Sequence, residues 1–169
     1  MALETQSIRG VTKNYGTRET QGKYGSNHTR LGAIKLAKWV FDYNGLPDAD
    51  TTNQGLSIPA NSTIVSAKLR IITAFTSTST TTDLTVGLQV AAGTEIDNDG
   101  LITAAQATQT TIAVAGSIID GASGTPAALV GKTIGATAGE LVVTPSVDDL
   151  TAGRAEMYVE YMLPNPQPA

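Results

Sequence analysis

The sequence predicts an all-β fold, a two-sheet antiparallel β-sandwich of jelly-roll type with an extended N-terminal arm. Charged residues are sparse, and Thr, Ala, Gly and Ser replace the Glu, Lys and Arg that are typical of surface helices. Several short segments alternate apolar and polar residues with the period of two that belongs to β-strands. Polar, Gly-rich or Ser/Thr-rich stretches separate these segments and are typical of turns. Seven or so short strands with such turns between them predict two packed sheets.

The first predicted strand covers residues 33–43 and is apolar on both faces. Alternation places Ile34, Leu36 and Val40 on one face and Trp39, Phe41 and Tyr43 on the other. Because one sheet face cannot bury both sets, we expect one of them to lie against a neighbouring subunit. The set that we assign to the oligomer interface is Trp39, Phe41 and Tyr43.

The remaining strands are predicted from the same alternation. Residues 63–75 and 84–90 each read as a half-buried strand, with a polar Thr/Ser loop at 76–82 between them. Residues 92–100 read as a loop, 101–108 as one short helix, and 148–153 as a polar connection. The further strand candidates are 112–119, 132–136, 140–145 and 154–163.

Residues 1–31 are predicted to form an arm, which precedes a sandwich domain at 32–163 and a Pro-rich tail at 164–169. The arm contains four glycines, and its few apolar residues follow neither the strand nor the helix period. Such a segment cannot bury enough surface to fold alone, so it is either disordered or held against something else. The tail contains three prolines, which lack the N–H needed for a β-ladder.

Charge divides the chain into two parts. Residues 1–40 carry seven basic and two acidic residues, a net charge of +5, whereas the rest carries four basic and thirteen acidic residues, a net charge of −9. The acidic body would repel a polyanion, so we expect no nucleic-acid partner. The basic arm suits an acidic protein surface, and the alternative is a solvated tail without a partner. The arm residues that we expect to bind the partner are Arg9, Lys13, Tyr15, Arg18, Lys23, Tyr24 and Arg30.

The sequence offers little for catalysis. The absence of cysteine excludes thiol catalysis, Cys-ligated zinc and disulfides. His28 is the one histidine and lies in the arm, where nothing would hold it rigidly as a base. Carboxylates at Asp148, Asp149 or Glu156 could supply a glycosidase pair, but the sequence does not place them opposite one another. We therefore expect no enzyme activity and no cofactor.

Residues 95–100 resemble the start of a calcium-binding loop, with oxygen-bearing side chains at alternate positions followed by glycine. The twelfth position of that motif is Gln106 instead of glutamate, and no convincing helix flanks the loop. We therefore interpret the segment as an acidic turn without a metal, and a calcium site is the alternative.

Three stretches together resemble structural proteins that tailed bacteriophages encode near the major capsid gene. Residues 56–69 look like the opening aliphatic-Pro-Ala/Gly-x-x-Ile-Val-x-x-Ala-x-Leu pattern of those chains. Residues 73–88 give a strand, a Ser/Thr loop and a second strand, and residues 150–161 look like the closing Leu-Thr-Ala-Gly segment with its Val-Glu-Tyr end. The likeness spans about residues 56–163 and is one of pattern.

The resemblance implies a capsid decoration or cement protein with a jelly-roll sandwich, which trimerises on the shell and has no active site to carry over. The implied partners are the major capsid protein and further copies of the chain, and the implied location is the virion surface after synthesis in the host cytoplasm. Neither a secretory signal nor a membrane-spanning apolar run is expected from the sequence. The arm cannot be aligned with these proteins, and its docking role is our inference. The rival interpretation is a phage tail or fibre module, or a glycan-binding sandwich, which would need exposed aromatic side chains on one surface.

Overall fold

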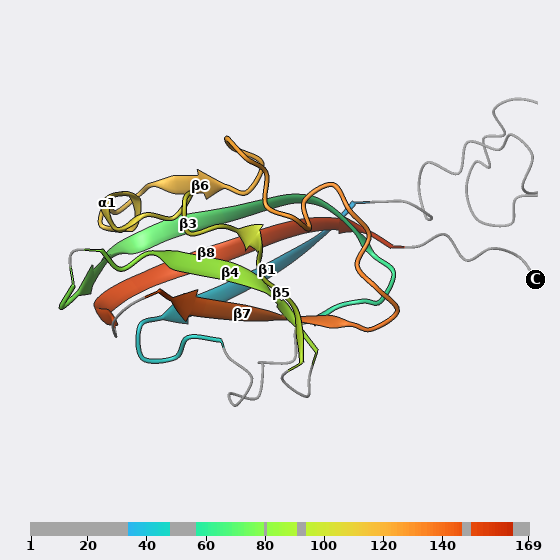
Figure 1. Cartoon of the computed structure of the whole chain (residues 1–169), viewed down its shortest axis with the longest axis horizontal. Coiled ribbons are helices and arrows are strands. Elements are labelled where there is room, and N and C mark those ends of the chain that lie inside the picture. Colours follow the sequence, from blue (N-terminus) through green and yellow to red (C-terminus); the bar gives the residue numbers. More distant parts are fainter. Residues whose placement is uncertain (1–33, 48–56, 80, 91–93, 147–149, 164–169) are drawn as a thin grey trace, which may run out of the picture.

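The computed structural model describes residues 34–47, 57–79, 81–90, 94–146 and 150–163, which form two four-stranded antiparallel sheets and one short helix (Figure 1). One sheet has the order β1-β8-β3-β6 and the other the order β2-β7-β4-β5. The strands of the first sheet are β1 (Ile34–Asp42), β8 (Leu150–Met162), β3 (Thr63–Ser77) and β6 (Ile118–Asp120). Those of the second are β2 (Ser57–Ile58), β7 (Gly139–Pro145), β4 (Leu84–Gln89) and β5 (Glu95–Ile102), and the helix is α1 (Gln109–Ile112).

The pairing of the strands is that of a jelly roll. The first strand pairs with the last, β2 with β7, β3 with β6, and β4 with β5, all antiparallel. This is the pattern of one long hairpin folded over on itself, and the β3–β8 and β4–β7 pairs then join the parts into two sheets. The predicted two-sheet antiparallel sandwich is therefore confirmed.

The two longest strands, β3 and β8, lie side by side and are the central pair of the first sheet (Figure 1). Their apolar residues alternate with polar ones, and the register sets Leu69 opposite Met157 and Ala67 opposite Val159. All four of these side chains are fully buried. Alternation in both strands thus directs one face of the sheet to the core and leaves the other face to solvent.

The core lies between the two sheets. Ile64, Leu69, Ile71 and Phe75 enter it from β3, and the opposite sheet contributes buried residues from β4 and β7. From β1, Trp39 and Phe41 also point inward and are only 7% and 5% exposed. The Phe41 and Phe75 rings lie 6.5 Å apart between centroids.

This burial corrects the predicted oligomer interface. Trp39 and Phe41 belong to the core of their own chain, so they are not available to a neighbouring subunit. Tyr43 lies just beyond the end of β1 and is 36% exposed. The exposed apolar side chains of this strand are Ile34, Leu36 and Val40, on the opposite face. The sandwich core takes Trp39 and Phe41 of the aromatic set, which sequence alternation alone could not establish.

The region between residues 95 and 136 departs from the prediction. The expected loop at 92–100 is wrong for residues 95–100, which begin strand β5, and residues 91–93 lie outside the described residues. The expected helix at 101–108 is also wrong. Leu101 and Ile102 are fully buried and finish β5, with Ile102 opposite Val86 in β4, so tertiary burial overrides the local pattern. A single helical turn forms later, at α1.

Two further strand predictions fail and one boundary moves. Within 112–119, Ile112 ends α1 and only residues from Ile118 onward form a strand. Within 132–136 the chain makes one isolated bridge, from Thr133 to Thr63. The expected polar connection at 148–153 is wrong from Leu150 onward, because β8 begins there with a buried leucine paired to β3.

Candidate interaction surface

Exposed aliphatic side chains gather on the outward face of the β1-β8-β3-β6 sheet. In β1 every second residue points away from the core, and Leu36 is 61% exposed. Ile118 in β6, at the other edge of the sheet, is 65% exposed. Ile34 is 56% exposed as well. Clusters of exposed aliphatic residues on a protein surface are typical of sites that contact another molecule.

A shallow groove of about 540 Å³ crosses this face. All four strands of the sheet, together with the turn before β6, contribute to it. The lining residues are Leu36, Ser66, Lys68, Arg70, Gly116, Ile118, Tyr158 and Glu160. We call this feature the sheet groove. Leu36 comes from one edge strand of the sheet and Ile118 from the other, and the charged lining residues come from the two central strands, β3 and β8.

Glu156 is the centre of an ion-pair network beside the sheet groove. Its carboxylate accepts a hydrogen bond of 2.7 Å from Lys38 Nζ and another from the Tyr158 hydroxyl, and Arg70 Nη1 lies 3.5 Å away. The Lys38 ammonium also lies 5.3 Å from the centroid of the Tyr158 ring. The hydrogen bond from Lys38, followed by that from Tyr158, holds the pKa of Glu156 below its usual range. The same contact with Glu156 raises the pKa of Lys38.

The two cations of the sheet groove are held less firmly than Lys38, which lies 2.7 Å from Glu156. Arg70 makes a longer contact with Glu156, at 3.5 Å, and its side chain is 56% exposed. Lys68 Nζ lies 3.8 Å from an oxygen of Asp120, and its side chain is 51% exposed. Glu160, by contrast, accepts a hydrogen bond of 2.7 Å from the Ser66 hydroxyl. Exposed ion pairs at such distances contribute little to stability, so both cations remain able to meet a further anion.

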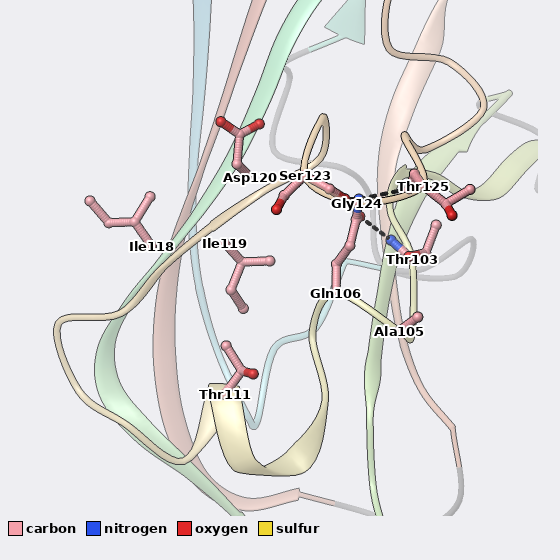
Figure 2. A pocket seen from close by; sticks show the side chains of 10 residues that line it. All are labelled: Thr103, Ala105, Gln106, Thr111, Ile118, Ile119, Asp120, Ser123, Gly124 and Thr125. Atoms are coloured by element: carbon pink, nitrogen blue, oxygen red, sulfur yellow. Dashed lines mark hydrogen bonds between the residues drawn. The ribbon is translucent and has the colours of Figure 1, made fainter.

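A second hollow, of about 500 Å³, lies between the turn at 103–106, α1 and the loop that follows β6 (Figure 2). Its wall is built around the side chain of Gln106. The Gln106 Nε2 donates to the carbonyl oxygens of Gly121, Ser123 and Thr125 at 3.0, 2.8 and 3.2 Å. Its Oε1 accepts from the Thr103 N–H at 2.9 Å. The amide therefore joins two loops, which is a structural role that its resemblance to a calcium-motif position did not indicate.

This second hollow lacks the groups for acid–base chemistry. Asp120 is its one titratable lining residue, and its carboxylate accepts from the Ala122 N–H at 2.9 Å and faces Lys68. The other polar lining groups are hydroxyls and the Gln106 amide. A general acid and a general base within reach of one substrate are not both present in this wall.

Three carboxylates, Glu95, Asp97 and Asp99, follow one another along β5, and we call them the β5 ridge. Burial raises the pKa of Asp97, and the neighbouring Asp99 and Glu95 add to this effect. Across the described ranges, the structure shows no group of three or more His, Cys, Asp or Glu side chains arranged to hold a metal ion. Those ranges also contain no helix that is long and apolar enough to cross a membrane.

The seven residues of the arm that we expect to bind a partner lie outside the described residues, as do His28, Asp148 and Asp149. Sequence reasoning predicted a half-buried strand over residues 63–75, which contains Lys68 and Arg70, but it missed the sheet groove. The groove depends on which strands are neighbours, since Leu36 and Ile118 are far apart in the chain and belong to opposite edges of one sheet.

No protein-family model matches the chain, and no curated protein matches it. Among solved structures, a chain of the capsid asymmetric unit of cyanophage Pam1 is similar, with a TM-score of 0.50 and 19% identity. The similarity covers 88% of this chain and 98% of that one. A chain of the acid-stable capsid of the Helicobacter pylori bacteriophage KHP30 gives a TM-score of 0.46 and 16% identity, over 80% of this chain and 92% of that one. The likeness to the Pam1 chain shows a shared fold.

Proposed function

We propose that the chain is a structural protein of a tailed-phage virion, and more specifically a decoration or cement protein that binds the outer surface of the head and stabilises it. The observation that carries this proposal is the fold shared with a chain of the Pam1 capsid, which extends over nearly the whole length of both chains. The sequence resemblance over residues 56–163 supports the same class of protein. No catalytic role is part of the proposal.

The arm is the part that we propose to bind the shell. Its residues Arg9, Lys13, Arg18, Lys23 and Arg30 would pair with carboxylates of the major capsid protein, and Tyr15 and Tyr24 would add apolar contact. Ordering a chain costs about 1–2 kcal/mol per residue in backbone entropy, so many contacts must form together. Strand addition to a shell protein would supply such contacts through backbone hydrogen bonds.

The sandwich is the part that we propose to assemble with further copies, as a trimer. The outward face of the β1-β8-β3-β6 sheet supports this proposal because Ile34, Leu36 and Ile118 are more than half exposed there. A cement that is tied to its own copies and also to the shell holds several shell subunits in place at once.

The test is co-sedimentation with empty capsids assembled from the shell protein of the same phage. Full-length protein should sediment with the capsids, and a variant lacking residues 1–31 should stay in the supernatant while retaining a folded sandwich by circular dichroism. Replacing Arg9, Lys13, Arg18, Lys23 and Arg30 with Gln should weaken binding and reduce its dependence on salt. Equal binding by the truncated form would mean that the arm is a loose tail. If neither form binds, the cement role fails and a tail or fibre role becomes the better interpretation.

A screen for esterase, glycosidase and phosphatase activity tests the non-catalytic part of the proposal separately. We expect no activity above background. Activity that disappears when a single carboxylate, such as Glu156, is replaced would contradict it.

A further inference from the structure

The sheet groove places two exposed cations between exposed aliphatic side chains. Its charged lining groups are Lys68, Arg70 and Glu160, so the lining carries one net positive charge, and Glu160 accepts a hydrogen bond from the Ser66 hydroxyl. The nearest carboxylates to the two cations lie at 3.8 and 3.5 Å, and both cations are about half exposed. Leu36 and Ile118 beside them are exposed aliphatics, which would exclude water from any ion pair formed between them and so strengthen it.

The β5 ridge carries the complementary charge. Glu95 and Asp99 are exposed and Asp97 is partly buried, on a strand at the free edge of the other sheet among the described strands. In the described part of the chain, the ridge carboxylates take part in no salt bridge. Two backbone N–H groups donate long hydrogen bonds of 3.3 Å to them, from Asn98 to Glu95 and from Asp99 to Asp97. The side chains of Asp97 and Asp99 also contact each other. Like charges placed this close repel one another unless a cation is brought to them.

We propose that the sheet groove of one copy receives the β5 ridge of a second copy, with Lys68 and Arg70 pairing with Glu95 and Asp99. This inference rests on the proposed homo-oligomeric state and names the surfaces that form it. The two surfaces differ and lie on different sheets, so the contact is heterologous, with the groove of each copy holding the ridge of the next. Such a contact generates a ring when the rotation between copies closes, and a trimer is the smallest ring beyond a pair.

Charge favours the ridge over the basic arm as the occupant. Residues 1–31 carry five basic and two acidic residues, so the arm would bring like charge to Lys68 and Arg70. The outward aliphatic side chains alone would accept many partners. The cations between them select one that carries carboxylates, and the described chain presents its closely spaced run of unpaired carboxylates on β5.

The experiment is a charge swap followed by sedimentation velocity at about micromolar protein concentration, where specific assemblies of this kind form. The variants are K68E/R70E, E95K/D99K and the combination of all four substitutions. Lys132→Glu is the matched control, because Lys132 is exposed and lies outside both surfaces. Circular dichroism verifies that each variant is folded, and the neutral pair K68Q/R70Q checks that loss of assembly does not depend on introduced repulsion.

We expect the wild type and Lys132→Glu to sediment as the same oligomer, and each double reversal to dissociate about tenfold or more readily. The combined variant should recover assembly, because it restores opposite charges across the contact. Three results would each overturn the inference. The K68E/R70E variant could assemble as the wild type does, the folded combined variant could fail to recover assembly, or the wild type could be monomeric. Capsid co-sedimentation separates this failure from that of the proposed function. A K68E/R70E variant that still assembles but loses capsid binding would show that the groove holds a segment of the shell protein instead.

Discussion

Two regions contribute to the same core in different ways. One is the paired strands β3 and β8, and the other is the chain between residues 95 and 136. The strand pair contributes a regular series of side chains over residues 67–71 and 155–159, where every second residue is buried and Leu69 lies opposite Met157. The irregular region inserts isolated anchors such as Ile112, Ile119 and Ile134, with turns between them. Its turns are held by backbone contacts and by the Gln106 amide. The first region therefore depends on close packing along its length, and the second on a few polar contacts.

The largest expected effect comes from Gly153, where β8 passes over the Phe75 ring. Gly153 has a φ of +131°, and a Cβ added there would lie 2.0 Å from Phe75 Cδ1. Gly153→Ala must therefore shift the buried ring or the strand and should cost about 3–5 kcal/mol in the free energy of unfolding. Urea denaturation measures this loss. The control is Gly116→Ala, at a φ of +87° but with no atom within 4 Å of the added Cβ, which should cost about 1 kcal/mol. Equal losses in the two variants would contradict the importance of packing here.

A smaller effect is expected from Gln106 in the irregular region. Gln106→Ala removes the donor from three carbonyl oxygens and the acceptor from one N–H, and should cost about 2–3 kcal/mol. Gln106→Glu should be at least as damaging, because a carboxylate would then face three carbonyl oxygens. Thermal denaturation compares both with Ser123→Ala, an exposed control whose backbone carbonyl is unchanged and whose loss should stay within about 0.5 kcal/mol. A stable Gln106→Ala variant would show that backbone contacts alone hold these turns.

The Glu156 network should give a modest dependence of stability on pH. The folded-state pKa of Glu156 lies below its usual value, so its contribution is present above the unfolded pKa and is lost as the pH falls through the folded value. The pKa of Lys38 is raised, so its contribution is present below its ordinary pKa and is lost as the pH rises through the folded value. Melting temperatures measured across pH should therefore decline less steeply on the acid side in Glu156→Gln than in the wild type. If the melting temperatures of both proteins fall equally at acid pH, exposure to solvent cancels the contribution of the network to stability.

The smallest expected effect is that of a chelator. The β5 ridge belongs to a strand and is not part of a metal-binding group among the described residues, so a chelator should leave the melting temperature unchanged. A bound calcium ion would add about 2.7 kcal/mol at a hundredfold excess over its dissociation constant. A melting temperature that falls with chelator and returns with calcium would establish the site that the sequence motif suggested.

The regular region could be predicted from the sequence, and the irregular one could not. Period-two alternation located β1, β3, β4, β7 and most of β8, because burial of one face imposes that pattern directly. Residues 95–102 contain four polar residues, one glycine and three aliphatic residues without period-two alternation, so their strand depends on pairing with β4 instead of on local preference. The inward direction of Trp39 and Phe41 and the assembly of the sheet groove likewise follow from which strands become neighbours, which alternation within one strand does not specify.

The proposed cement function requires that this protein stabilises a phage head, and the rupture temperature of the capsid measures that stabilisation. Empty capsids would be heated with and without saturating protein, and shell rupture followed by light scattering and by negative-stain microscopy. We expect a higher rupture temperature with the full-length protein and no increase with the variant that lacks residues 1–31. A rupture temperature that is unchanged by saturating full-length protein would contradict the cement function.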